Sequence, residues 1–190
     1  YKNEVGDSNR IKFLQFDFES LNTSELNLFL NIENGIDVLI NNAGYLVNET
    51  FGQISESNLR RMYEVNVLGP FRLMQVIIPL LREDNSHVIN IGSMGGVQGS
   101  VKFSGLSAYS SSKGGMSILT ECLAEEYKES NIKFNCLALG AVQTEMLNEA
   151  FPGYEASVSA KEMAQHIYGF ALNGSRFING KVISVSNSTP

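Results

Sequence analysis

The chain has few cysteines and no recognisable leader. Only Cys122 and Cys136 occur among its 190 residues, both in apolar segments, and no charged segment followed by an apolar one opens the sequence. This pattern is typical of the reducing cytoplasm, where structural disulfides are rare, so we expect a cytoplasmic protein. Because the first residue is Tyr1 and not methionine, we expect the sequence to be a fragment of a longer polypeptide.

The chain also lacks an excess of basic charge and a long apolar run. Its 14 basic and 20 acidic residues give a net charge of -6, which disfavours nucleic acids and anionic membranes as partners. The longest strongly apolar run, residues 73–81, contains a proline and is too short to cross a bilayer. His87 and His166 have no partners at a metal-binding spacing, so no metal site is expected.

What is present is an alternation of strand and helix patterns. Short runs rich in apolar and β-branched residues alternate with longer helical segments, as expected for a parallel sheet covered by helices. Several runs are almost continuously apolar, as strands buried on both faces should be. The candidate strands span residues 11–18, 37–42, 87–93, 134–139 and 181–186. With no internal repeat or linker, the sequence predicts one α/β domain over residues 1–190.

The helical segments have recognisable starts and apolar stripes. Residues 55–83 begin at a Ser55 cap and contain Pro70, where a kink is expected. A capping box at residues 159–162 opens a later helix. The segment after Tyr109 carries an apolar stripe at helical spacing, formed by Met116, Leu119, Leu123 and Tyr127.

The stretch "SAYSSSKGG", residues 107–115, places a tyrosine and a lysine one helical turn apart among small residues. At this spacing Tyr109 and Lys113 project from the same helix face, and a neighbouring ammonium favours the phenolate. Such a pair suits proton transfer near neutral pH, although the same pattern also occurs on solvated helix faces. The small neighbours keep bulk away from the face that carries the pair.

Polar and small residues follow two of the predicted strands. The motif "NNAG" (residues 41–44) ends one strand and lets a ligand approach the backbone, and Ser93 ends the next strand. Open α/β sheets bind ligands at this carboxyl edge, although a polar turn and an ordinary loop serine are alternative interpretations. Asn66 lies inside a helical segment between apolar neighbours, which favours partial burial of a residue type that forms helices poorly.

These features follow one another in the order NNAG, an asparagine inside a helix, a serine after the next strand, and Tyr-x-x-x-Lys. In this combination the chain resembles the short-chain dehydrogenase/reductase family over essentially its whole length, from "FLQFD" to "INGKVISVS". The resemblance implies a Rossmann-like, doubly wound parallel sheet and an NAD(P)-dependent oxidoreductase. Such an enzyme would interconvert a carbonyl and a secondary alcohol on a small to medium, partly apolar molecule.

The resemblance also implies roles for four catalytic residues. Tyr109 would protonate the substrate oxygen during reduction and act as the base in oxidation, while Lys113 would lower the pKa of the tyrosine and hold the nicotinamide ribose. Ser93 would donate a hydrogen bond to the carbonyl oxygen. Asn66 would hold a water that links Lys113 to solvent. The cofactor would supply the hydride, and the protein would supply the positioning and the electrostatic stabilisation.

A second set of residues would hold the cofactor, either NAD or NADP. Asp17 corresponds to an acid that contacts the adenine, and an aspartate that begins a helix is the alternative interpretation. The adenosine side would be lined by residues 42–44, and the nicotinamide carboxamide and the phosphates would be contacted from the segment after residue 139. The cofactor-binding set is Asp17, Asn42, Ala43, Gly44, Tyr109, Lys113, Val142 and Thr144.

The chain departs from the family pattern in three places, of which the smallest is Leu139 in the position of the usual proline. The family opens with a strand, a glycine-rich loop and a helix that holds the pyrophosphate, and no such portion precedes Tyr1, so the first β-α-β unit is expected to be missing. The loop between Ser93 and Tyr109 is longer than usual. Within it Phe103 and Leu106 would form a substrate wall, and Ser104 or Ser107 would be alternatives to Ser93.

Two further expectations concern the oligomeric state of the protein and a non-catalytic alternative to an enzyme. The helical segments 55–83 and 109–128 resemble the pairing helices of the family, so we expect a homodimer or homotetramer. The alternative to an enzyme is a non-catalytic binding or scaffold protein that kept the fold and lost its cofactor loop. The four catalytic candidates favour the enzyme, because a scaffold has no use for all of them.

Overall fold

A parallel sheet of four strands lies at the centre of the computed structural model, which describes residues 13–18 and 35–187. The strands pair in the order β1-β2-β3-β4, and all three pairings are parallel. The sequence therefore predicted the α/β class and the parallel sheet correctly, with strand ends that differ by at most two residues. The strands are β1 (Val38–Asn41), β2 (Ser86–Ser93), β3 (Ile132–Leu139) and β4 (Lys181–Val185).

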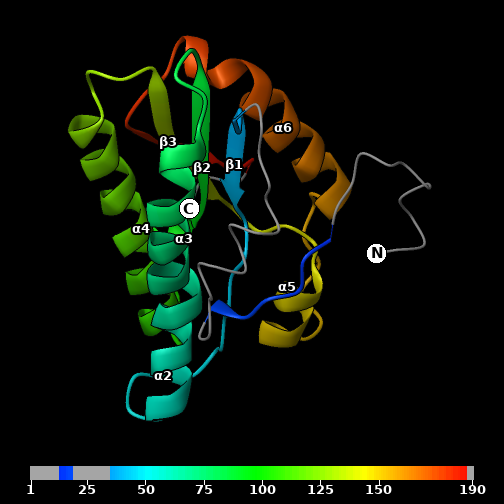
Figure 1. The fold of residues 1–190 in the computed structure, drawn as a ribbon. Helices are drawn as coiled ribbons and strands as arrows, with labels where there is room; N and C mark the ends of the chain where they lie inside the picture. The colour runs from blue at the N-terminus through cyan, green and yellow to red at the C-terminus, as the bar shows by residue number, and fades with distance from the viewer. Residues whose placement is uncertain (1–12, 19–34, 188–190) are drawn as a thin grey trace.

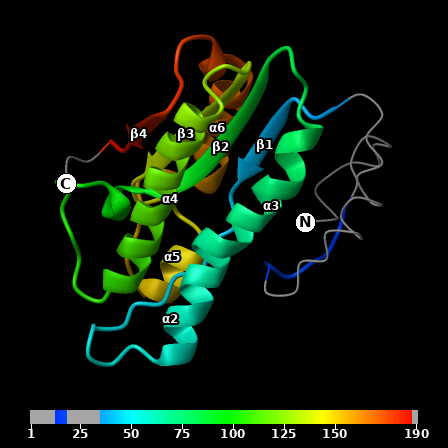
Figure 2. The same cartoon turned by 60° about the vertical axis from the view of Figure 1, so that its left-hand side comes forward.

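Helices cover both faces of this sheet, as Figures 1 and 2 show. On one face lie α3 (Gly69–Ile77) and α4 (Ser107–Glu126), and on the other lies α6 (Ala160–Asn173). The apolar stripe expected on α4 faces the sheet, and the predicted capping box opens α6 at Ser159. The short helix α5 (Glu145–Ala150) lies beyond the carboxyl ends of the strands.

Two hydrophobic cores result from the alternation of side chains along the strands. Val88 and Phe134 are paired in register and pack with the helices α3 and α4, whereas Ile89 and Leu137 pack with α6. All four side chains are fully buried. Each such burial contributes about 1.5–3 kcal/mol, so the central strands β2 and β3 carry much of the stability of the sheet.

A chain of buried amides connects the sheet to α4. The Asn41 Nδ2 donates to Asn90 Oδ1 at 2.7 Å, and the Asn90 Nδ2 donates to Thr120 Oγ1 at 2.9 Å. Buried polar groups are costly unless they are paired, so these bonds favour one register of β1 against β2 and one position of α4. The chain fixes Asn41, and with it the start of the NNAG motif, at the edge of the sheet.

The long helical segment is interrupted at the position of Asn66. It consists of α2 (Glu56–Tyr63), a π-helical turn η2 (Glu64–Leu68), α3 and a 3-10 turn η3 (Ile78–Leu80). The Ser55 cap is confirmed, because its side chain accepts from the Asn58 amide at 3.1 Å. Pro70 lacks the N–H that would bond the Asn66 carbonyl four residues back, and the Gly69 amide bonds Glu64 instead. The distortion expected from Pro70 therefore lies in the turn just before it.

The prediction of a strand at residues 11–18 is wrong for residues 13–18, the part of this range that the structure describes. Residues 13–17 have no regular secondary structure, and in the described chain β1 pairs only with β2. The ring of Phe18 packs on Gly69, and its carbonyl accepts from Arg72 Nη2 at 2.6 Å. The segment thus lies against α3, where no strand offers it ladder hydrogen bonds. Residues 11 and 12 lie outside the described residues.

No helix within residues 13–18 and 35–187 combines the length and the apolar character needed to cross a bilayer.

Candidate active site

Three of the predicted catalytic residues meet where β2 ends beside α4. Ser93 is the last residue of β2, and Tyr109 and Lys113 lie on the first turns of α4. The Lys113 Nζ lies 6.0 Å from the centroid of the Tyr109 ring, and the Ser93 hydroxyl lies close enough to influence the pKa of Tyr109. Of the three candidate serines, Ser93 is half-buried beside the tyrosine, whereas Ser104 and Ser107 are exposed.

Lys113 is buried to an unusual degree for a lysine, with 4% of its surface exposed. Its Nζ donates to the Ile91 carbonyl at 2.8 Å, so the ammonium is anchored to β2. Burial lowers its pKa from 10.5 to about 8, and the nearby Cys136 opposes this shift. Gly96 makes the position possible, because a Cβ there would lie 2.7 Å from the backbone of α4. The small residues of this region thus let the loop and helix meet.

Tyr109 is held as a neutral phenol. Burial raises its pKa above 10, and the hydrogen bond from Ser93 opposes the rise. The expectation that Lys113 lowers the pKa of Tyr109 below its usual value is therefore wrong. The ammonium is itself desolvated, donates to the Ile91 carbonyl, and lies 6.0 Å from the centroid of the Tyr109 ring. At neutral pH the tyrosine therefore carries the proton that an acid must donate.

Asn66 joins the loop after β1 to α4. Its Oδ1 accepts from the Tyr45 amide at 2.8 Å, and its Nδ2 donates to the Tyr45 carbonyl and to Ser112 Oγ, both at 2.9 Å. The side chain is 1% exposed. Because these bonds occupy the amide, a water held at this position would use the Asn66 backbone carbonyl, which Pro70 cannot bond. The water-holding role stays a prediction.

The NNAG motif reaches the same site through its glycine. A Cβ at Gly44 would lie 3.5 Å from Lys113 Nζ and 3.6 Å from Asn66 Oδ1, so a ligand could contact the Gly44 backbone and the lysine together. Asn42 and Ala43 are exposed directly after β1. These positions fit a cofactor sugar that lies along the carboxyl edge of the sheet.

The remaining residues predicted to bind the cofactor, Val142, Thr144 and Asp17, lie outside this cluster. Thr144 caps α5 by accepting from the Leu147 amide at 3.2 Å, and Val142 is half-buried in the segment that leads there from β3. Asp17 is exposed in the segment that lies against α3 and does not follow a strand of the sheet. The strand end on which its adenine contact was predicted is therefore absent.

The predicted substrate wall lies on another surface. Phe103 and Leu106 line a groove of about 770 Å³ along the outer side of α4, together with Ile118 and small residues such as Ser110 and Gly114. Tyr109 projects from the inner side of the helix and does not line this groove. That Phe103 and Leu106 face the substrate stays a prediction, since the groove they line does not include Tyr109.

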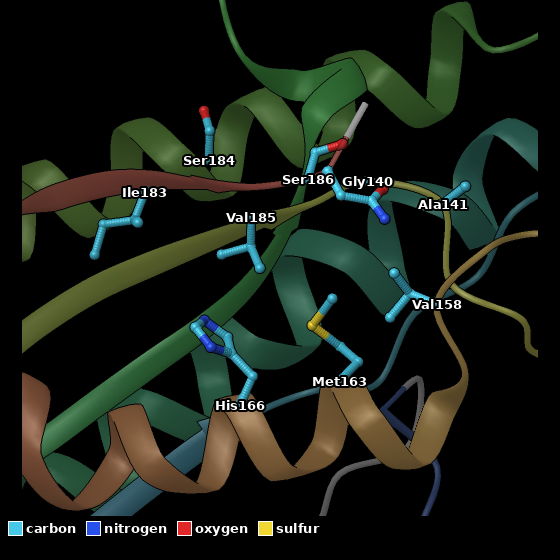
Figure 3. A pocket seen from close by; sticks show the side chains of 10 residues that line it. Gly140, Ala141, Val158, Met163, His166, Ile183, Ser184, Val185 and Ser186 are labelled. Atoms are coloured by element: carbon cyan, nitrogen blue, oxygen red, sulfur yellow. The ribbon is translucent and has the colours of Figure 1, made fainter. Parts of the chain in front are cut away.

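A second hollow, of about 380 Å³, lies between the ends of β3 and β4 and the helix α6 (Figure 3). Val158 and Met163 form one side of it, and His166 points from α6 toward Val185. None of the four catalytic candidates lines it. In the part of the chain that the structure describes, no three His, Cys, Asp or Glu side chains are grouped as metal ligands.

Several residues that shape the site were not identified from the sequence. They are Asn90, Ser112 and Tyr45, whose contacts bridge elements far apart in the chain. The signal for Asn90 was an asparagine inside an otherwise apolar strand, which must find a partner when buried. Ser112 and Tyr45 carried no such signal.

Comparison with known proteins agrees with this geometry. A family model described as short chain dehydrogenase matches residues 2–155. The chain belongs to the short chain dehydrogenase family. Nodulation protein G from Rhizobium sp. strain N33 is 32% identical to this family member over 164 residues, which cover 80% of the chain and 65% of the relative. The 3-oxoacyl-(acyl-carrier-protein) reductase FabG of Thermotoga maritima is 30% identical over 162 residues, covering 79% and 64%.

Solved structures of short chain dehydrogenases share the fold. A short-chain dehydrogenase/reductase from Brucella melitensis superposes with a TM-score of 0.82 at 23% identity, over 97% of this chain and 78% of the other. A protein from Escherichia coli CFT073, described as a short chain dehydrogenase complexed with NADPH, gives 0.79 at 23% identity, over 89% and 72%. The chain thus spans about two thirds to three quarters of these relatives.

The buried ammonium of Lys113 leads to a prediction about stability. The unfolded lysine keeps its proton up to about pH 10.5, whereas the folded one releases it above about pH 8. Between these values the unfolded state binds more protons, so stability attributable to Lys113 rises with pH. Relative to Lys113→Met, the unfolding free energy of the wild type should increase by about 2 kcal/mol from pH 8 to pH 9.5, as measured by urea denaturation. A constant difference would contradict the burial.

Proposed function

We propose that the protein is an NAD(P)-dependent oxidoreductase that interconverts a carbonyl and a secondary alcohol, with Tyr109 as the acid and base. The observation that carries the proposal is the meeting of a neutral phenol, a serine and a buried ammonium at the carboxyl edge of a parallel sheet. Family membership supports it, because curated relatives of this chain include reductases.

Each side chain has a task in carbonyl reduction. Ser93 and Tyr109 donate hydrogen bonds to the carbonyl oxygen, and the tyrosine passes its proton to that oxygen as negative charge develops there. A reduced nicotinamide, when bound, would supply the hydride to the carbonyl carbon. Lys113 would hold the ribose hydroxyls of the cofactor, and Asn66 keeps the loop at Tyr45 against α4 so that Gly44 stays beside the lysine.

Tyr109 would serve both directions of the reaction. Burial raises its pKa, so at neutral pH the protein without ligands holds the protonated form that reduction uses, whereas oxidation uses the phenolate. The hydroxyl reprotonates after turnover through Lys113 and the water proposed at the Asn66 carbonyl. Tyr109 is thus proposed to donate the proton, and Lys113 to take part in replacing it.

The substrate is proposed to be small to medium and partly apolar. The segment that follows β3 contributes Met146 and Leu147 of α5, both half-buried, near the site. A relative at 30% identity is named for reduction of a 3-oxoacyl group, which has this character, so 3-oxoacyl thioesters are the first substrates to try.

The cofactor is proposed to be NAD or NADP. The match to a short chain dehydrogenase structure that holds NADPH supports a nicotinamide dinucleotide, and Gly44 leaves the backbone open beside Lys113. The protein is proposed to act in the reducing cytoplasm, because its two cysteines are both free thiols and Cys136 is buried.

The first test is Tyr109→Phe, which removes the proton and keeps the ring. The rate of reduced-nicotinamide oxidation with carbonyl substrates should fall about 10²- to 10⁴-fold, while the dissociation constant of the nucleotide, measured by its fluorescence, stays within about twofold. The matched control is Tyr63→Phe, a tyrosine on α2 whose hydroxyl bonds Ser111 at 2.9 Å outside the site. It should keep full activity.

Two results would count against this assignment. Retained turnover in Tyr109→Phe would remove the tyrosine from the chemistry. Failure of the wild type with every carbonyl, together with no nucleotide binding, would favour the non-catalytic binding protein.

The protein is also proposed to be a homodimer or homotetramer. The groove on α4 carries Ile118, which is 60% exposed, and α2, η2 and α3 expose Tyr63, Leu68 and Phe71. Large apolar side chains gathered on two neighbouring helices are typical of surfaces covered by a partner.

Assembly can be tested with one charge. Ile118→Glu should convert the dimer or tetramer to a monomer in sedimentation velocity, because a carboxylate cannot be buried unpaired. Tyr168→Glu is the control, since Tyr168 is 65% exposed on α6, away from these helices. A monomeric wild type would contradict the proposal.

A further inference from the structure

His87 is a buried, titratable side chain at the amino end of β2, at the opposite end of the strand from Ser93. Its side chain is 1% exposed, and its ring centroid lies 5.3 Å from that of Phe170 on α6. Both ring nitrogens have partners. Nδ1 lies 3.2 Å from the carbonyl oxygen of Ala171 on α6, and Nε2 lies 3.0 Å from Asn135 Nδ2 on β3. The proposed reaction does not use this histidine.

Asn135 decides which ring nitrogen of His87 carries the hydrogen. Its Oδ1 accepts from the Lys181 amide at 3.2 Å, and its Nδ2 donates to the Ile178 carbonyl at 2.9 Å. These two backbone partners fix the orientation of the amide, so a donor faces Nε2 of the histidine. Nε2 must therefore accept. The hydrogen of the neutral ring lies on Nδ1, which donates to the Ala171 carbonyl.

The ring and the amide together join four elements at the amino edge of the sheet. β2 contributes His87, β3 contributes Asn135, α6 contributes the Ala171 carbonyl, and β4 is reached through the Lys181 amide. The Ala171 carbonyl is among the last four of α6, where a helix leaves its carbonyls without regular partners. The neutral ring thus binds the end of α6 to the centre of the sheet.

A second proton on His87 does not fit this arrangement. At Nε2 it would point at Asn135 Nδ2, which is itself a donor. Turning the amide over would place its oxygen against the Ile178 carbonyl and its nitrogen against the Lys181 amide, so both backbone bonds would be lost. A buried charge without a partner is costly. Protonation and the closed arrangement are therefore incompatible.

No charge on the described neighbouring elements offsets this cost. Burial lowers the pKa of His87 below 6.5, and the hydrogen bond to the Ala171 carbonyl opposes the shift. The titratable side chains on or next to the elements around the ring are Asp37, Lys133, Tyr168, Arg176 and Lys181. None of them contributes to the shift. Asp37, the one carboxylate among them, lies 3.4 Å from Arg82 and is engaged there.

We propose that His87 and Asn135 form an acid-sensitive latch: the neutral ring holds the end of α6 and the turn before β4 against β2 and β3, and its protonation releases them. The latch does not depend on the proposed function. The opened histidine binds a proton below about pH 6.5, whereas the closed one does not, so the latch is fully stable above this pH and weakens as the pH falls. The ratio of open to closed molecules should rise up to about tenfold for each pH unit below 6.5.

The closed latch can be observed directly, because the chain has only 2 histidines. Nitrogen-15 spectra of His166→Gln leave His87 as the one imidazole signal. At pH 7.5 this signal should show the hydrogen on Nδ1 and a bare Nε2. His166 is exposed on α6 and points toward Val185 (Figure 3), away from the latch, so its replacement leaves the latch intact. A hydrogen on Nε2 of His87 would overturn the proposal.

Release of the latch can be measured by hydrogen exchange, as protection factors at pH 7.5 and pH 5. The Lys181 amide, which Asn135 holds, should lose protection by about tenfold or more, whereas the amides of α4, on the other face of the sheet, should keep theirs. His87→Gln keeps a donor and an acceptor but takes up no proton, so its protection should not change with pH. The matched control, His166→Gln, should behave as the wild type does.

Three results of the exchange experiment would overturn the latch. The first is a Lys181 amide that stays protected while the His87 ring titrates at its ordinary pKa near 6.5, because the protonated ring would then be tolerated. The second is an equal loss of protection in α4, which would mean unfolding of the whole domain. The third is the same loss in His87→Gln. If that variant does not fold, the ring titration and the Lys181 amide of His166→Gln still decide.

Discussion

The amide of Asn66 is the constraint on which the rest of the site depends. It is fully enclosed and uses its oxygen and both its hydrogens, so that the loop at Tyr45 and the helix α4 at Ser112 are held at fixed distances from each other. Three buried hydrogen bonds, each of about 1 kcal/mol net, depend on a π-helical turn that Pro70 makes favourable by offering no N–H. Without that turn the asparagine would be displaced along its helix, and Gly44 would leave Lys113.

Desolvation then sets the protonation of Tyr109 and Lys113, the two residues proposed to carry the chemistry. Burial makes the charged forms of Tyr109 and Lys113 less stable, which raises the pKa of the phenol and lowers that of the ammonium to about 8. The two groups thus hold protons that differ in availability: the phenol keeps its proton until a carbonyl oxygen develops charge, and the lysine exchanges its own near neutral pH. An exposed pair at the same helical spacing would have neither property.

Much of the fold could be predicted from local patterns, because apolar runs, helix caps and the stripe on α4 depend on neighbouring residues. The contacts of Asn66 could not, since Tyr45 is 21 and Ser112 is 46 positions away. The burial that reverses the expected pKa of Tyr109 is likewise a property of the packed structure. Residues 13–18 were mistaken for a strand because their closely spaced apolar residues are typical of one, whereas in the structure only Phe18 packs on α3 and Phe13, Leu14 and Phe16 are exposed. The groove that Phe103 and Leu106 line with residues of α4 could not be predicted either, because it depends on how their loop folds against the helix.

The protonation of Tyr109 in the ligand-free protein tests the account most directly. In protein carrying carbon-13 at the tyrosine Cζ, the Tyr109 resonance can be assigned from its loss in the phenylalanine variant and followed with pH. The account predicts that this carbon keeps the chemical shift of a neutral phenol beyond pH 10, because burial opposes ionisation. A titration of this carbon below about pH 9 would contradict it, since the ammonium and not burial would then govern the tyrosine.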